Sequence, residues 1–204
     1  FDTGDIAMQA QVELPDGSGG AAAEQIGGSR GGELMVAALA ALLDGAERPV
    51  FIAGRGARRA GPDVAALAER CGALLATSAV ANGLFAGDPW SLGISGGFAT
   101  PLAVELITGA DLVVAWGASL TMWTTRHGEL IGPSATVVQV DDDPTALGAQ
   151  RPVHLGVHGD VKKMLSGLED KRMSDKVAKL RFPEPVPCGR TPLTAEALSR
   201  SYGS

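Results

Sequence analysis

Two kinds of hydrophobic pattern alternate along the chain and divide it into predicted helices and strands. Four segments repeat apolar side chains at helical spacing, namely residues 31–45, 62–71, 100–107 and 160–168. Short, almost continuous apolar runs lie between them, as expected of buried parallel strands, at residues 49–53, 73–76, 111–116, 136–140 and 153–157. This alternation predicts an α/β fold in which helices connect parallel strands.

Capping residues indicate where several elements begin. Pro62 is expected at the first position of its helix, and Thr100 precedes a proline in the manner of an N-cap. Asp160 is expected to cap the last helix, and Asp143 a short helical turn after the fourth strand. In the first helix, the predicted buried stripe consists of Leu34, Met35, Ala38, Leu39, Leu42 and Leu43.

Composition changes along the chain predict one domain between two tails. Residues 1–30 are rich in glycine and serine and are interpreted as an N-terminal linker or tail, followed by a domain over residues 31–170. Residues 171–204 are expected to form a C-terminal linker helix and a proline-rich tail. Within the domain, residues 77–99 contain five glycines without a clear period and are predicted to be a long loop.

Charge and cysteine content exclude several classes of function. The formal net charge is −6, which argues against nucleic acid and anionic membranes as partners. The 2 cysteines can form neither a disulfide scaffold nor a repeated zinc-binding motif, so a reducing cytoplasm is the expected location. No apolar run approaches the roughly 18 residues that a membrane span needs. The pattern predicts a soluble cytoplasmic protein.

The turns at the carboxyl ends of parallel strands are where ligands bind in such sheets. Gly54 and Gly56 follow the first strand, but position 59 is an arginine, so the dinucleotide fingerprint is incomplete. Asp141 ends the fourth strand and is placed to accept hydrogen bonds from ligand hydroxyls. No lysine precedes residue 162, which excludes a Walker phosphate loop.

Two other kinds of functional site, a serine hydrolase site and a metal site, are supported only by weaker motifs. Gly93 to Gly97 matches the Gly-x-Ser-x-Gly pattern of serine hydrolases around Ser95, but the required strand-turn-helix context is not predicted there. His154 lies on a predicted strand and His158 in the turn after it. At period 2 they share a face, but no third ligand lies nearby, so no metal site is predicted.

An ordered set of segments resembles the central domain of thiamine-diphosphate-dependent enzymes, the superfamily of acetolactate synthase, benzoylformate decarboxylase and oxalyl-CoA decarboxylase. The resemblance covers residues 32–169. The segments that carry it read RPVFIAGRG (48–56), NGLFAGDP (82–89), LGISGG (92–97), ADLVVAWGA (110–118), VVQVDDDP (137–144) and VHGD (157–160).

This resemblance implies a Rossmann-like, doubly wound parallel sheet of about six strands with helices on both faces. It also implies the middle one of three domains. In the family, thiamine diphosphate and Mg²⁺ are held by a Gly-Asp-Gly motif in the C-terminal domain, and the activating glutamate comes from the N-terminal domain. The Gly-Asp pairs of this chain are followed by Ile6, Pro89 and Val161. The chain is therefore expected to be an excised central region without catalytic residues, whose partners are the missing domains of a homo-oligomeric parent.

The resemblance also implies a nucleotide pocket, because relatives hold FAD or ADP at this sheet edge. Gly54 and Gly56 would approach the phosphates, and Gly117 would admit the ligand. The other implied site residues are Gly93, Gly96 and Gly97 along the pocket and Asp141 and Asp143 at the ribose. The chain departs from flavin-binding members at residues 118–121, where their arginine is missing, which removes a charge-assisted contact. A free-standing module for FAD, ADP or NAD is the alternative interpretation.

Overall fold

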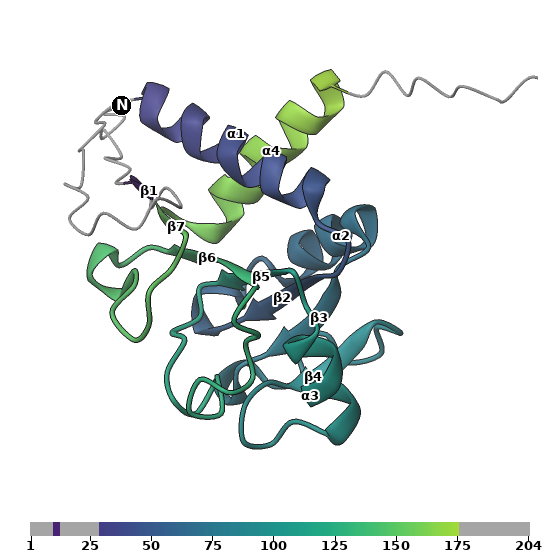
Figure 1. The fold of residues 1–204 in the computed structure, drawn as a ribbon. Helices are drawn as coiled ribbons and strands as arrows, with labels where there is room; N and C mark the ends of the chain where they lie inside the picture. Colours follow the sequence, from purple (N-terminus) through teal and green to yellow (C-terminus); the bar gives the residue numbers. More distant parts are fainter. Residues whose placement is uncertain (1–9, 13–28, 176–204) are drawn as a thin grey trace, which may run out of the picture.

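The structure is a computed structural model that describes residues 10–12 and 29–175. One seven-stranded sheet has the order β1-β7-β6-β5-β2-β3-β4 (Figure 1). Its strands are β1 (Ala10–Val12), β2 (Pro49–Ala53), β3 (Leu74–Thr77), β4 (Ser91–Ile94), β5 (Leu112–Trp116), β6 (Thr136–Asp141) and β7 (Leu155–His158). The six strands β2 to β7 pair in parallel, and β1 pairs antiparallel with β7. The predicted parallel α/β sheet is confirmed.

The helices are distributed unevenly over the two faces of this sheet. One face is covered by α1 (Ser29–Gly45), α2 (Gly61–Cys71) and α4 (Val161–Asp175). Within the described part of the chain, the other face carries α3 (Pro101–Thr108) and the coil of residues 117–135 (Figure 1). The crossover from β5 to β6 is thus made by coil. Among the described residues, no helix combines the length and the apolar character that a membrane crossing requires.

The strands are almost continuously apolar because both faces of the sheet are covered. In β2, Phe51 packs into the core beneath α1, α2 and α4, whereas its neighbour Ile52 packs toward α3. Trp116 at the end of β5 lies edge-on against Phe51, with ring centroids 5.5 Å apart. Alternate side chains of one strand therefore enter two different cores, which explains why the central strands β2 and β5 have no polar positions.

The capping predictions are confirmed at three helix starts. The Thr100 hydroxyl accepts a hydrogen bond from the Ala103 amide at 3.2 Å, and Asp143 caps the turn η3 (Pro144–Ala146). The Asp160 carboxylate accepts from the Lys163 amide at 3.0 Å at the start of α4. Pro62 is the second residue of α2, which begins at Gly61.

The structure departs from the predicted pattern in three places. Residues 77–99 contain the strand β4 and the short turn η2 (Ala79–Ala81), so the prediction of one long loop was wrong. The prediction missed β4 because all four of its residues are only half-buried and its pairing with β3 shifts register. The strand β1 lies within the predicted N-terminal tail. Leu34, predicted to be buried, is 53% exposed, because α1 contacts the core through Met35, Leu39 and Leu43.

Candidate functional site

The sheet has a topological switch point between its neighbouring central strands β2 and β5. The chain leaves β2 toward β3 on one side, and leaves β5 toward β6 on the other. Diverging connections of this kind open a crevice beyond the carboxyl ends of the strands. A cavity of about 630 Å³ lies there. Its lining comes from the turns after four strands: Gly54, Arg55, Gly56, Ser78, Ala79, Val80, Gly117, Ala118, Ser119, Thr121, Trp123, Thr124, Asp141 and Asp142.

Three glycines let two backbone segments cross at the floor of this cavity. A Cβ atom on Gly54 would lie 2.1 Å from the Gly117 carbonyl oxygen, and one on Gly117 would lie 2.5 Å from the Gly56 Cα. Gly117 also adopts a φ of 53°, which L-residues with a side chain rarely occupy. These glycines are required by the crossing of the turns after β2 and β5.

The amides of these glycines are used inside the protein. Gly54 N–H donates to the Trp116 carbonyl at 2.8 Å, and Gly56 N–H donates to the Gly117 carbonyl at 3.0 Å. Gly117 N–H donates to the Val140 carbonyl at 2.8 Å. The crossing turn thus already occupies the amides of Gly54 and Gly56, and the close approach of these glycines to phosphates stays a prediction. They do line the cavity, as does Gly117.

The polar side chains of the cavity differ in whether they have hydrogen-bond partners within the protein. The hydroxyl of Ser78 is buried and has no hydrogen-bond partner. Arg55 lies exposed at the rim, and Asp141 is only 8% exposed. Burial raises the pKa of the Asp141 carboxyl, and the nearby carboxylates of Asp142 and Asp143 raise it further, against a hydrogen bond from the Asp143 amide that lowers it. The cavity therefore combines one cation, two carboxyl groups and an unsatisfied hydroxyl.

Asp143 lies outside the cavity lining, and its side chain binds the neighbouring residue Thr145. Its carboxylate accepts hydrogen bonds from the Thr145 hydroxyl at 2.7 Å and from the Thr145 amide at 2.9 Å. These two bonds hold the pKa of Asp143 below its ordinary value. Asp143 is thus a cap of η3, and only Asp141 of the two predicted ribose contacts faces the cavity.

The glycines of residues 93–97 also lie outside the lining. Gly93 adopts a φ of 77° in β4, at the edge of the sheet. A Cβ on Gly96 would lie 1.9 Å from the Trp123 carbonyl oxygen, and Gly97 N–H donates to that same oxygen at 3.2 Å. Gly96 and Gly97 therefore serve the contact between two loops.

Ser95, the candidate hydrolase nucleophile, is engaged in the same loop contact. Its side chain is buried, and its hydroxyl donates to the Thr124 carbonyl at 2.8 Å. His154 Nδ1 instead accepts from the Val137 amide at 2.9 Å, which places the imidazole beside β6. The structure does not bring Ser95 and this histidine together as a nucleophile and its base.

The described residues do not fit thiamine diphosphate or its metal. They contain no cluster of three or more histidine, cysteine, aspartate or glutamate side chains that could hold a metal ion. The Gly-Asp pairs at residues 87 and 159 are followed by Pro89 and Val161, so neither forms a Gly-Asp-Gly motif. The cavity can accommodate a small polar molecule, but it supplies no assembled nucleophile and base.

Sequence reasoning missed several lining residues. Ser78 directly follows β3 and Arg55 is the second residue after β2, and those positions at strand ends are the signal that would have selected them. Trp123 and Thr124 come from the coil after β5, where no periodicity marks which side chains turn toward the cavity.

Residues 36–168 match the family described as thiamine pyrophosphate enzyme, central domain. The chain is 34% identical over 151 residues to a sulfoacetaldehyde acetyltransferase of Alcaligenes xylosoxydans xylosoxydans, covering 71% of this chain and 25% of that protein. It is 36% identical over 132 residues to a probable 2-ketoarginine decarboxylase of Pseudomonas aeruginosa, covering 64% and 23%. It is 33% identical over 128 residues to a probable chloroplastic acetolactate synthase 2 of Oryza sativa subsp. japonica, covering 62% and 19%. The chain thus spans about a quarter or less of the length of these curated relatives.

Proposed function

The chain belongs to the family of thiamine pyrophosphate enzyme central domains, and from this membership we propose that it is the middle domain of a thiamine-diphosphate-dependent enzyme. The observation that carries the proposal is the family match over residues 36–168. We further propose that the parent enzyme decarboxylates a 2-oxo acid and, in the carboligase case, transfers the remaining fragment to an acceptor. Relatives named as a decarboxylase, an acetyltransferase and an acetolactate synthase support this reaction class.

We propose that the chain's own role is architectural. Residues 31–170 would form the domain, and residues 1–30 and 171–204 would lead to the neighbouring domains. The coverage of about a quarter of each relative supports this arrangement. The two cores on opposite faces of the sheet provide a rigid body that can hold neighbouring domains at a constant distance.

The neighbouring domains would supply the cofactor site. Thiamine diphosphate and Mg²⁺ would bind there, because the described residues of this chain offer neither the motif nor a metal-ligand cluster. The isolated chain is therefore proposed to be catalytically inert. The free-standing nucleotide-binding module receives no support from the matches, and the internal hydrogen bonds of the Gly54 and Gly56 amides count against a diphosphate contact at that turn.

Calorimetry with thiamine diphosphate and Mg²⁺ tests this proposal. The 204-residue chain is titrated alone, and in parallel with a longer polypeptide in which its flanking coding sequence is retained. We expect no binding to the chain alone. For the longer polypeptide we expect saturable binding together with cofactor-dependent release of CO₂ from 2-oxo acids.

Two outcomes would contradict the proposal. Cofactor-dependent CO₂ release by the chain alone would refute its inertness. A longer polypeptide that folds but does not bind thiamine diphosphate would refute the assignment to a thiamine-dependent parent. Calorimetry of the chain alone with FAD, ADP and NAD separately checks the nucleotide-binding alternative.

A further inference from the structure

Asn82 is the only asparagine of the chain, and a glycine follows it. The two residues lie in the turn after η2, and both are exposed. They belong neither to the cavity lining nor to the two hydrophobic cores. In any asparagine, a bond between the side-chain carbonyl carbon and the backbone nitrogen of the next residue closes a five-membered ring. Whether this pair can close that ring depends on the structure around it.

The backbone nitrogen of Gly83 is open to reaction. Gly83 adopts a φ of 87°, and a Cβ placed on it would meet no atom within 4 Å. Within the described part of the chain, neither the Gly83 N–H nor the Asn82 carboxamide makes a hydrogen bond. The attacking nitrogen and the carbon that it would attack are therefore held by no other group, and no neighbouring atom crowds the glycine.

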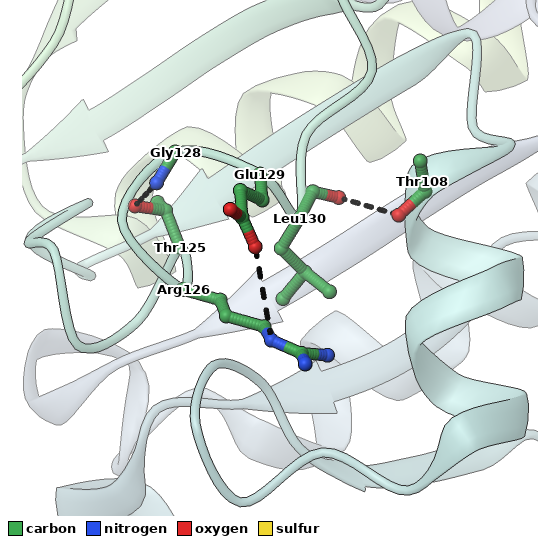
Figure 2. Close-up of polar contacts among 6 residues, drawn as sticks. All are labelled: Thr108, Thr125, Arg126, Gly128, Glu129 and Leu130. Atoms are coloured by element: carbon green, nitrogen blue, oxygen red, sulfur yellow. Dashed lines mark hydrogen bonds and ion pairs between the residues drawn. The ribbon is translucent and has the colours of Figure 1, made fainter.

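A second surface turn shows the kind of restraint that this pair lacks. In the coil after β5, Gly128 N–H donates to the Thr125 hydroxyl at 3.1 Å (Figure 2). In the same turn, Arg126 Nε lies 4.0 Å from a carboxylate oxygen of Glu129 (Figure 2). Side chains thus hold the peptide groups of that turn in place. Among the described residues, no side-chain contact of this kind fixes the Asn82–Gly83 peptide group.

The Asn82–Gly83 peptide group can rotate without moving the rest of the turn, because Ala81 and Phe85 on either side of it are buried anchors. The hydrogen bond from Leu84 N–H to the Ala81 carbonyl, at 3.1 Å, spans this peptide group and would open as it rotates. The net cost of losing one backbone hydrogen bond that water can replace is small. Ring closure is therefore compatible with the folded chain.

We propose that Asn82 is a site of spontaneous deamidation in the folded protein. The Gly83 nitrogen gives up its proton to solvent and attacks Cγ of Asn82. The bond between Cγ and Nδ2 breaks, and the departing nitrogen takes up a proton, so that ammonia leaves and a succinimide remains. Water then opens the ring. Opening at the side-chain carbonyl gives an aspartyl residue, and opening at the main-chain carbonyl gives an isoaspartyl residue. Each reaction consumes a water molecule and releases an ammonia molecule, without an oxidant or a reductant.

The product changes both charge and backbone at a defined place. A carboxylate replaces a neutral amide, so the formal net charge of −6 becomes one unit more negative. The isoaspartyl form also adds a methylene group to the main chain, which the open space around Gly83 can accommodate. The new carboxylate lies two residues beyond Val80, which lines the cavity. The modification is independent of the reaction that the parent enzyme carries out.

Timed incubation of the full chain at neutral pH tests the proposal, with mass spectrometry of the intact chain and of its peptides. We expect the replacement of NH₂ by OH at Asn82, with ammonia released in equal amount. An isoaspartyl methyltransferase detects isoaspartate in the same peptide, and Asn82→Asp supplies the aspartyl standard. A synthetic peptide of residues 78–87 gives the rate without the fold. The folded chain should react no more than about tenfold slower than the peptide, the effect of first breaking one hydrogen bond.

Substitutions around the pair identify the reacting atoms. Asn82→Gln should abolish the reaction, because a glutamine has to close a six-membered ring. Gly83→Ala should slow it severalfold, since a Cβ beside the attacking nitrogen obstructs ring closure. Gly87→Ala is the matched control, because Gly87 also has a φ of 87° and an open Cβ position but does not follow an asparagine. This control should react at the wild-type rate. Circular dichroism establishes that each variant is folded.

Three results would overturn the proposal. The first is a folded chain that keeps its amide, or that reacts far more than about tenfold slower than the peptide, because the fold would then protect Asn82. The second is a mass change that persists in Asn82→Gln, which would place the reaction at a glutamine. The third is an unchanged rate in Gly83→Ala, which would show that the Gly83 nitrogen is not the attacking atom.

Discussion

The crossing of two backbone turns at the cavity floor leads to a quantitative prediction for Gly117→Ala. The new Cβ would lie 2.5 Å from the Gly56 Cα and 2.7 Å from the Gly56 carbonyl carbon, so one of the two turns has to move. The hydrogen bond from Gly56 N–H to the Gly117 carbonyl, 3.0 Å long, holds these turns together and would be stretched by that movement. The substitution therefore acts on packing and on a backbone hydrogen bond at once.

The magnitude follows from two separate costs. An alanine at the φ of 53° that Gly117 adopts costs about 1–2 kcal/mol. The displacement of packed backbone costs about 1–3 kcal/mol more. We expect Gly117→Ala to lower the free energy of unfolding by about 2–5 kcal/mol, a large fraction of the roughly 5–15 kcal/mol typical of a folded domain.

Urea denaturation followed by tryptophan fluorescence measures this loss, because Trp116 is fully buried beside the crossing. Two glycines separate the contributions. Gly83 has a φ of 87° with nothing within 4 Å of its added Cβ, so Gly83→Ala should show the conformational cost alone. Gly54→Ala, at a φ of −108°, should show the steric cost alone, since its Cβ would meet the Gly117 carbonyl oxygen at 2.1 Å. If Gly117→Ala costs no more than Gly83→Ala, the tight crossing inferred from the structure is refuted.

Two carboxylates give further predictions, both checked by the free energy of unfolding as a function of pH. Burial by itself raises the pKa of Asp111, but hydrogen bonds from the Glu47 and Arg48 amides, at 2.7 and 3.0 Å, hold it below its ordinary value. Its contribution to stability is present above the unfolded pKa of about 3.9 and is lost as the pH falls through the folded value. Asp111→Ala should therefore cost about 1–2 kcal/mol at neutral pH and less in acid; an equal loss at both pH values would contradict this account. Burial raises the pKa of Asp141, so its charged form destabilises the fold above that raised value. Asp141→Asn should stabilise the protein at neutral pH, and the gain should disappear as the pH falls to the ordinary carboxyl pKa; a neutral or destabilising effect at pH 7 would show that the charge is compensated.

The capped helices and the central strands could be predicted because their signals are local. Thr100, Asp143 and Asp160 bind amides two or three residues away, so the pattern that predicts the cap also contains its partner. The apolar run of β5 shows that the strand is buried on both faces, whichever neighbours pack on it. The family resemblance, carried by these same segments in order, is confirmed by the match over residues 36–168.

The edge strands could not be predicted in this way. The short strand β4 is half-buried and pairs with β3 through an irregular register. The strand β1 has only three residues and pairs with β7, which lies about 145 positions away in the sequence. Neither strand carries the continuous apolar run that identifies the central ones, because each lies at an edge of the sheet.

By itself, the sequence determined the class of fold, the order of its elements and the turns at which a ligand site would lie. Only the tertiary structure decided what each glycine in those turns does. Gly54, Gly56 and Gly117 meet in the cavity lining, whereas Gly96 and Gly97 lie outside it and join their loop to the coil that carries Trp123. The physical reason is that the amides of a turn are free for a ligand only when no other backbone segment accepts their hydrogen bonds. Which segment lies beside a turn depends on the order of the strands in the sheet.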